Sequence, residues 1–206
     1  MGVNIAIIDY GMGNVHGLYK KLHALNANPF VTSSSADISK ADKIILPGVG
    51  HFKSAHNKIR SSEINDPLNE MVQIKKVQVL GICLGMQLMA KHSEEGDAEG
   101  LGWIDARVKK FTITDRNKFK VPQSGWNTIK PSKQSNLLNH INDQSEFFFL
   151  HSYHYDEVDQ HDILTKTLFE YEFVSAIEKD NIFGTQFHPE KSHLHGSQFL
   201  KNFIRL

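Results

Sequence analysis

The chain has 206 residues, a length typical of one domain, and 40% of them are hydrophobic, as in ordinary globular proteins. Lysine plus arginine number 23, and aspartate plus glutamate also number 23, so no basic field favours nucleic acid or an anionic membrane as partner. A single cysteine excludes an internal disulfide, and no apolar stretch is long enough to span a membrane. We therefore expect one cytoplasmic domain, residues 1–206, without a signal peptide.

The first half of the sequence alternates short apolar runs with helical patterns. Val3–Asp9 ends at a glycine-rich turn, as expected of a strand buried on both faces. Asn14 is a candidate N-cap for the helix that follows. This alternation predicts right-handed βαβ units and a mostly parallel sheet. We expect further strands at Pro29–Thr32, Lys43–Gly50 and Val77–Ile82, and further helices at Asp66–Ile74 and Leu84–Lys91.

The second half is dominated by strand-like segments, and the last two of them meet at a hairpin turn, Asp180–Asn181. A short amphipathic helix is expected around Ser197–Ile204. The predicted fold class is α/β with three layers, a mostly parallel central sheet flanked by helices, and an antiparallel β excursion in the C-terminal half. The strand-like segments are Gly102–Ile113, Ser145–Tyr153, Asp162–Phe169, Tyr171–Asp180 and Asn181–Phe187.

The only cysteine, Cys83, stands in the pattern Gly-Ile-Cys-Leu-Gly between a predicted strand and a predicted helix. This is the pattern of a nucleophile elbow, in which side chains at both glycine positions would clash. The backbone N–H of Leu84 is then the first candidate donor to a developing oxyanion. Free cysteines are also among the most buried residues of proteins, so a core cysteine is the alternative at this point.

A base for the thiol is available near the end of the chain. His188 and Glu190 are two residues apart, so at a strand end they can lie on one side, with the carboxylate orienting the imidazole. Pro189 between them cannot continue a sheet ladder, which fits a strand end. Cys83, His188 and Glu190 therefore match the nucleophile, base and orienting group of a catalytic triad.

The histidines raise the alternative of a metal site, because they occur in two groups. Neither group has the spacing of a strong zinc signature, and the only thiol is better explained as a nucleophile. We therefore expect no metal and no cofactor. The two groups are His151, His154 and His161, and His188, His193 and His195.

Seven motifs together resemble a known family. Leu46–Gly50 (LPGVG), Gly81–Met89 (GICLGMQLM) and Gly184–Ser192 (GTQFHPEKS) are similar to the three signatures of class I, triad-type glutamine amidotransferases. Four more resemble, more narrowly, the glutaminase subunits of imidazole glycerol phosphate synthase, and all seven follow the family's order. These four are Asp9–Asn14 (DYGMGN), Gly100–Ile104 (GLGWI), Gly125–Asn127 (GWN) and His151–Tyr153 (HSY).

The resemblance implies an activity, the release of ammonia from glutamine. Cys83 would attack the carboxamide to form a glutamyl thioester, His188 would handle protons, and water would then release glutamate. The expected oxyanion residues are Gly48, Val49, Gly50 and Leu84, and the expected contacts of the glutamine α-amino and carboxylate groups are Gln87, Ser152 and Tyr153. From the residues alone, Gln87 could instead be an exposed helix residue, and residues 152–153 a loop after a strand.

The resemblance also implies a partner, a (β/α)8-barrel synthase subunit that forms a heterodimer with this chain and receives the ammonia. In histidine biosynthesis the products would be imidazole glycerol phosphate and AICAR. The glutaminase would be weakly active until the partner and its ligand restructure the oxyanion strand. Asn14, Trp126 and Lys191 lie in motifs that face this partner in the family. From the sequence alone, Trp126 could equally be an exposed contact residue or a core residue.

Some stretches depart from the family's usual pattern, all near the expected partner face. Gln123 and Ser124 replace a His-Met pair, His16-Gly17 replaces Arg-Ser, and Gly50–Ile59 differs from the common version. A paralogous subunit that supplies ammonia for amidation of a surface-polysaccharide sugar is therefore the first alternative. The others are a free-standing cysteine hydrolase, such as a γ-glutamyl hydrolase or DJ-1-like protein, and a non-catalytic binding subunit.

Overall fold

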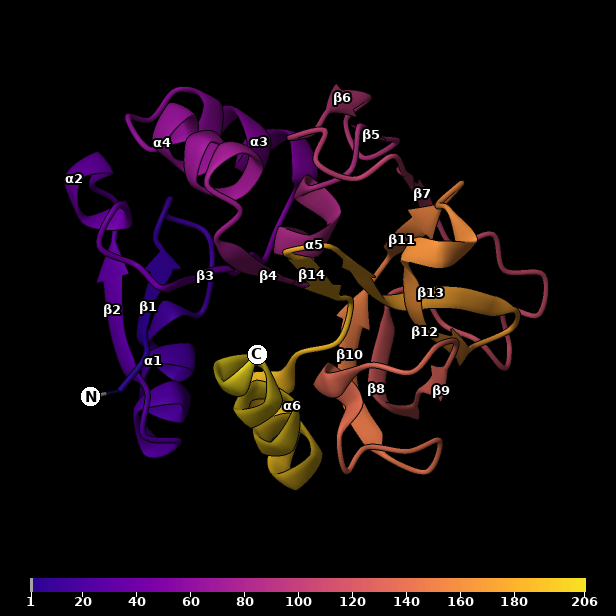
Figure 1. Ribbon diagram of the computed structural model, residues 1–206. Helices are drawn as coiled ribbons and strands as arrows, with labels where there is room; N and C mark the ends of the chain where they lie inside the picture. The colour runs from indigo at the N-terminus through magenta and orange to yellow at the C-terminus, as the bar shows by residue number, and fades with distance from the viewer. Residues whose placement is uncertain (1) are drawn as a thin grey trace.

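The computed structural model describes residues 2–206, and a large sheet runs through the middle of the molecule (Figure 1). Five neighbouring strands of this sheet are parallel to one another. The side chains of β1 (Asn4–Ile8) alternate between two cores. Ala6 and Ile8 belong to one core cluster, whereas Ile5 and Ile7 belong to the other. The strand is thus buried on both faces, as its continuous apolar run predicts. In spatial order these strands are β2 (Asn28–Thr32), β1 (Asn4–Ile8), β3 (Lys43–Leu46), β4 (Gln78–Ile82) and β14 (Ile182–Thr185).

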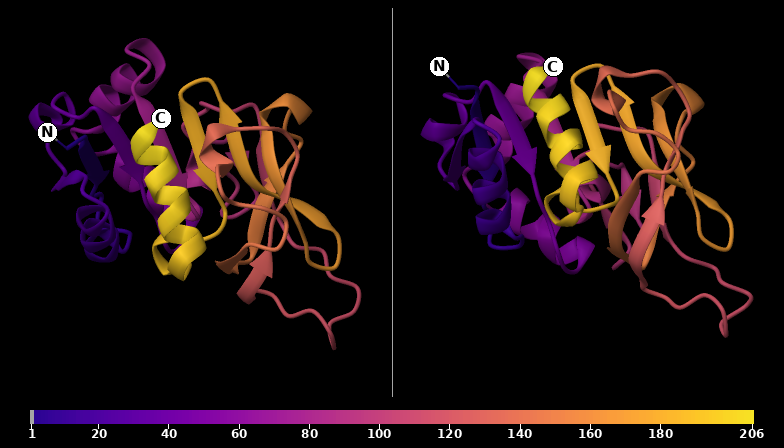
Figure 2. Two further views of the ribbon diagram at one scale, coloured as in Figure 1. Left: turned by 60° about the horizontal axis from the view of Figure 1, so that its bottom comes forward. Right: turned by 90° about the horizontal axis from the view of Figure 1, so that it is seen from below.

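Helices cover both faces of this sheet. The helices α1 (Val15–Ala24) and α6 (His193–Arg205) lie on one side, where they contribute Leu22 and Phe203 to one core cluster (Figures 1 and 2). The opposite side supplies the other cluster, so the predicted three-layer α/β class is confirmed. That side carries α2 (Ser35–Ile38), α3 (Phe52–Arg60), α4 (Asn65–Asn69), the π-helix η1 (Glu70–Ile74) and α5 (Leu84–Leu88).

The second half of the chain extends the sheet with antiparallel strands, as predicted. The hairpin between β13 (Glu172–Lys179) and β14 turns at Asp180, which has a left-handed φ of 51°. A separate ribbon of two antiparallel strands, β8 (Gln123–Thr128) and β10 (Glu146–His151), packs beside the sheet. The remaining strands are β5 (His92–Ser93), β6 (Ala98–Glu99), β7 (Arg107–Lys110), β9 (Lys130–Pro131), β11 (Tyr153–Asp156), β12 (Ile163–Leu168) and β13 (Glu172–Lys179), and the short 3-10 helices are η2 (Asn136–Leu138), η3 (Gln160–Asp162) and η4 (Pro189–Lys191).

Several boundaries differ from the sequence prediction. The strand expected at Gly102–Ile113 is limited to β7, and the helix expected at Leu84–Lys91 ends at Leu88. Beyond Leu88 the backbone turns to pair with residues 100–104 instead of continuing the helix. Helix α6 begins four residues earlier than expected, and α3 and β8 were not predicted. Over residues 2–206, no helix has both the length and the apolar character needed to cross a membrane.

Candidate active site

Cys83 lies in the sharp turn between β4 and α5. Its backbone has a left-handed φ of 54°, which is rare for a residue other than glycine and is typical of strained functional positions. A Cβ added at Gly85 would lie 1.8 Å from the carbonyl oxygen of Leu46, and one at Gly81 would lie 2.7 Å from the nitrogen of Met86. The structure therefore confirms that both flanking positions require glycine.

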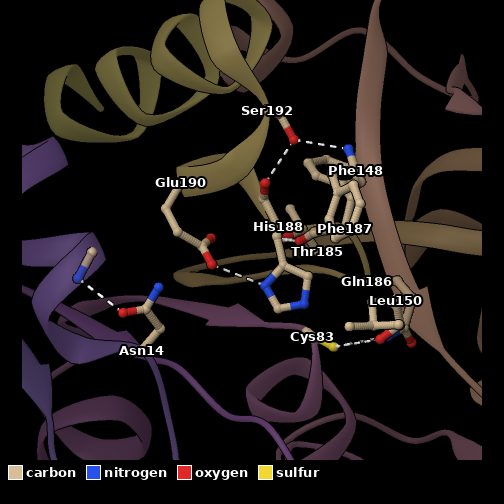
Figure 3. A network of polar contacts seen from close by, with 11 residues as sticks. Asn14, Cys83, Phe148, Leu150, Thr185, Gln186, Phe187, His188, Glu190 and Ser192 are labelled. Atoms are coloured by element: carbon tan, nitrogen blue, oxygen red, sulfur yellow. Dashed lines mark hydrogen bonds and ion pairs between the residues drawn. The ribbon is translucent and has the colours of Figure 1, made fainter. Parts of the chain in front are cut away.

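The backbone of His188 is fixed by the edge of the β8–β10 ribbon. Its N–H donates to the carbonyl of Phe148 over 2.9 Å. Ser192 Oγ donates to the His188 carbonyl over 2.6 Å and accepts from the Phe148 N–H over 2.9 Å. These bonds aim the imidazole into the space between Glu190 and Cys83 (Figure 3). Segments far apart in sequence thus meet at this point.

The imidazole of His188 has different surroundings on its two nitrogen atoms. Nδ1 lies 2.9 Å from Oε1 of Glu190, and both side chains are almost fully buried. A carboxylate only accepts, so Nδ1 carries the proton that joins them. Nε2 has no hydrogen-bond partner within residues 2–206. This is the arrangement of a triad histidine, with one nitrogen oriented by a carboxylate and the other placed to exchange protons with substrate.

The electrostatics of the site favour a charged imidazole. Burial by itself would lower the pKa of His188, but the neighbouring Cys83 and Glu190 outweigh it and raise this pKa to about 10. An imidazolium beside a thiol stabilises the thiolate, which is the reactive form. The site therefore places a positively charged imidazole beside the thiol.

A pair of hydrogen-bonded glutamine side chains contacts the thiol through one of its members, Gln186, which was missed from the sequence. Gln186, on the strand end before His188, is buried and points its Nε2 at Cys83 Sγ over 3.6 Å. Its Oε1 accepts from Gln87 Nε2 over 3.0 Å, and the same Gln87 nitrogen donates to the Tyr153 carbonyl over 2.9 Å. Gln87 is only 4% exposed, so the alternative of an exposed helix residue is wrong.

A cavity of about 250 Å³ opens at the thiol and gathers most of the predicted site residues. Glu190 is not part of its wall, because it lies behind the imidazole. Gly48 is also outside the lining: a Cβ there would lie 2.4 Å from Tyr10 Oη, so it packs behind the wall. Sequence reasoning missed four lining residues: Glu95, Pro122, Leu150 and His151. The lining consists of Val49, Gly50, Cys83, Leu84, Gln87, Glu95, Pro122, Leu150, His151, Ser152, Tyr153 and His188.

Two of the histidines that suggested a metal site, His151 and His154, form hydrogen bonds with protein groups. His151 Nδ1 donates to the Tyr153 carbonyl over 2.8 Å, and burial lowers the pKa of His151 to about 3, so this ring is neutral. His154 Nε2 accepts from the hydroxyl of Tyr171 over 2.9 Å. Within residues 2–206, no group of three or more histidine, cysteine, aspartate or glutamate residues is placed to hold a metal ion.

The three residues expected at a partner face come from three different elements, the start of α1, β8 and η4. Asn14 is the N-cap of α1, and its Oδ1 accepts from the N–H of Gly17 over 3.0 Å. Trp126 lies on β8 and is 45% exposed, so the alternative of a core tryptophan is wrong. Lys191 is exposed, with Nζ 5.7 Å from the centre of the Phe148 ring.

Comparison with curated proteins identifies relatives along almost the whole chain. It is 46% identical over 201 residues to "Imidazole glycerol phosphate synthase subunit HisH 2" of Methanococcus maripaludis, with 98% of each chain covered. It is 42% identical over 204 residues to "Imidazole glycerol phosphate synthase subunit HisH" of Leptospira borgpetersenii, with 98% of this chain and 100% of that one covered. The HisH 2 subunit of Pseudomonas aeruginosa is 44% identical over 202 residues, with coverage of 98% and 99%.

Solved structures and a family profile agree with these relatives. PurLQS from Thermotoga maritima matches with a TM-score of 0.76 at 16% identity, covering 100% of this chain and 99% of that one. A crystal structure of a glutamine amidotransferase matches with a TM-score of 0.74 at 15% identity, covering 97% and 96%. At these identities the structures show the fold alone. The profile of glutamine amidotransferase class-I matches residues 6–206. The chain therefore belongs to the class-I glutamine amidotransferases and, within them, to the HisH subunits of imidazole glycerol phosphate synthase.

Proposed function

We propose that this chain hydrolyses glutamine to glutamate and ammonia as the glutaminase subunit of imidazole glycerol phosphate synthase, in histidine biosynthesis. The observation that carries the proposal is the buried group of Cys83, His188 and Glu190 beside a cavity of about 250 Å³. A thiol alone, or a histidine alone, would have a structural explanation. A strained thiol facing an oriented imidazole, in a chain that matches HisH subunits along its length, supports catalysis.

In the first step, the sulfur of Cys83 attacks the carboxamide carbon of glutamine. The C–N bond breaks as the leaving amine takes a proton from His188 Nε2, so ammonia departs and a glutamyl thioester remains. In the second step, water gives a proton back to His188 and its oxygen attacks the thioester carbon. The C–S bond then breaks, and glutamate leaves with Cys83 and His188 restored.

Both steps place negative charge on the carbonyl oxygen of glutamine. The N–H of Leu84 belongs to the first turn of α5, where backbone N–H groups lack partners within the helix. Val49 and Gly50 line the cavity from the loop after β3, and Gly50 has a left-handed φ of 115°. We assign the oxyanion site to Leu84 together with this loop.

The role of Glu190 is testable by Glu190→Gln, which keeps the shape of the side chain and removes its charge. We expect turnover to fall roughly 10²- to 10⁴-fold, as for orienting carboxylates in other triads. Because Glu190 helps to raise the pKa of His188, that pKa should fall below about 10. NMR titration of the His188 ring measures it, and an unchanged titration curve would contradict the assigned pair.

Among the described residues, Glu95 is the only acidic one that lines the cavity, so we assign it to the positively charged α-amino group of glutamine. Its Oε2 accepts from the N–H of Phe52 over 2.7 Å, which fixes the carboxylate. The variant Glu95→Gln should raise KM for glutamine about tenfold with little change in kcat, the loss of one charge-assisted hydrogen bond. Steady-state glutamate release gives both constants. A lower kcat at an unchanged KM would exclude this role.

The ammonia acceptor is the second part of the proposal. A (β/α)8-barrel synthase subunit would dock on the face that carries Trp126, Lys191 and Asn14. On that face of this chain, the apolar residues Val49, Leu150 and Trp126 are 45%, 42% and 45% exposed. Val49 and Leu150 also line the cavity, so a partner seated there would cover the route by which ammonia leaves.

The test combines this chain with the synthase subunit of the same organism and follows both products. We expect slow glutamate release by the chain alone, faster release in the complex, and imidazole glycerol phosphate formed from glutamine. Glutamate release by the complex without that product would instead favour the surface-polysaccharide subunit. Full activity without any partner, on γ-glutamyl peptides and not on glutamine, would indicate a free-standing hydrolase.

A further inference from the structure

An exposed tryptophan on the ribbon is held by a histidine from another element. The rings of Trp126 and His193 are stacked face to face, with centroids 4.9 Å apart and planes 9° from parallel. Trp126 belongs to β8, and His193 is the first residue of α6. The Phe148 ring makes an edge-to-face contact with the same indole, with ring centroids 6.0 Å apart and planes at 69°. The indole is therefore fixed on two sides while 45% of the residue stays exposed.

The backbone of His193, whose ring stacks on Trp126, is strained. Its φ is 43°, in the left-handed region, although the residue begins a helix. Its carbonyl accepts from Lys21 Nζ over 3.3 Å and from Ser197 Oγ over 2.7 Å, which holds this geometry from two elements. Strain of this kind persists only where the surroundings enforce it, and it is concentrated at functional positions.

The stacked pair lies on a surface that continues from the mouth of the active-site cavity. Trp126 is the register partner of Phe148 on β10, and Leu150 is the next residue of β10 on the same outward face. Leu150 is 42% exposed and lines the cavity beside Cys83. The surface that surrounds the exit of the cavity therefore includes a rigid, exposed aromatic ring.

We propose that His193 is a positioning residue that pre-orients Trp126 as an anchor for the synthase subunit. This inference rests on the proposed function, because that function identifies the partner. The surface of the partner must offer an apolar socket for the indole. A side chain that is already immobilised loses less conformational entropy on binding, so the stack should strengthen the complex.

The experiment compares three variants by calorimetric titration with the synthase subunit. His193→Gly removes the ring without adding backbone strain, since glycine accepts a positive φ. We expect its Kd to rise roughly 3- to 10-fold, the cost of ordering one aromatic side chain on binding. His193→Phe restores a ring and should return Kd to near the wild-type value. His140→Gly is the matched control, because His140 is also exposed with a left-handed φ of 62°.

A second measurement tests the stack in the free chain. The His193 ring protons should show an upfield ring-current shift in the NMR spectrum that disappears in Trp126→Leu. Equal Kd values for the wild type and His193→Gly would overturn the inference, and so would a His193→Phe variant that binds as weakly as His193→Gly. If the wild-type chain shows no binding to the synthase subunit, the partner assignment of the proposed function fails first.

Discussion

Replacing Cys83 by alanine should abolish glutamine hydrolysis, with a loss on the order of 10⁴- to 10⁶-fold in turnover. The reason is that no other thiol exists in the chain, and among the described residues the cavity at Cys83 has no alternative nucleophile oriented by a base. Glutamate release in the complex with the synthase subunit gives the rate. A variant that keeps its turnover would exclude the proposed thioester mechanism.

The fold of Cys83→Ala should remain intact, which makes the loss interpretable. Within residues 2–206, the hydrogen bonds of the sulfur to Gln186 Nε2 and to the Leu150 carbonyl oxygen are long, 3.6 Å and 3.8 Å. Thermal unfolding should therefore occur close to the wild-type temperature. A glutamine-analogue electrophile provides an independent measurement, since it should label the wild-type chain on Cys83 and leave the variant unlabelled. Failure to label the wild type would favour a non-catalytic subunit.

Replacing Gly85 by alanine should destabilise the protein by about 3 kcal/mol or more, which for a chain of this size lowers Tm by roughly 6 to 12 °C. The new methyl group would lie 1.8 Å from the carbonyl oxygen of Leu46, a backbone atom at the end of β3. The Leu46 carbonyl cannot easily move away from the methyl group, because β3 is paired with β1 on one edge and with β4 on the other. Thermal and urea unfolding measure the change.

Gly102→Ala is the control for this prediction. Gly102 has a left-handed φ of 69° and no atom within 4 Å of an added Cβ, so the substitution adds backbone strain without a clash. That strain costs about 1–2 kcal/mol. A Gly85→Ala variant as stable as Gly102→Ala would show that the turn at Cys83 relaxes more easily than its contacts indicate.

The elements that sequence analysis predicted correctly are those with an unambiguous apolar pattern. The continuous apolar runs that became β1 and β4 are short and end at turns, which favours strands buried on both faces, and the Asn14 cap began α1 as expected. Helix α3 was missed although Phe52, Ala55 and Ile59 have helical spacing, because polar residues separate them. Strand β8 was missed because its residues are mostly small or polar and its partner strand lies far along the chain.

In the candidate site, too, the residues with a clear local sequence pattern were predicted and those without one were missed. Cys83, His188 and Glu190 followed from local patterns, a glycine-flanked turn and an i, i+2 pair at a strand end. Glu95 could not be found in that way, because it enters the cavity from a turn beyond α5 and only the tertiary fold brings it near the thiol. Gln186 could have been predicted from the sequence, since it lies two residues before His188 and would share one side of an extended segment with it.

The β8–β10 ribbon is attached to the rest of the molecule without being part of its main sheet. One side of β10 holds the His188 backbone through Phe148, and its Leu150 carbonyl faces the thiol, whereas the outer face of the ribbon carries Trp126. One strand, β10, therefore contacts both reacting groups and pairs with the strand that carries Trp126. We expect docking to change the separation between sulfur and imidazole, so that the ribbon acts as a mechanical link between partner and catalysis.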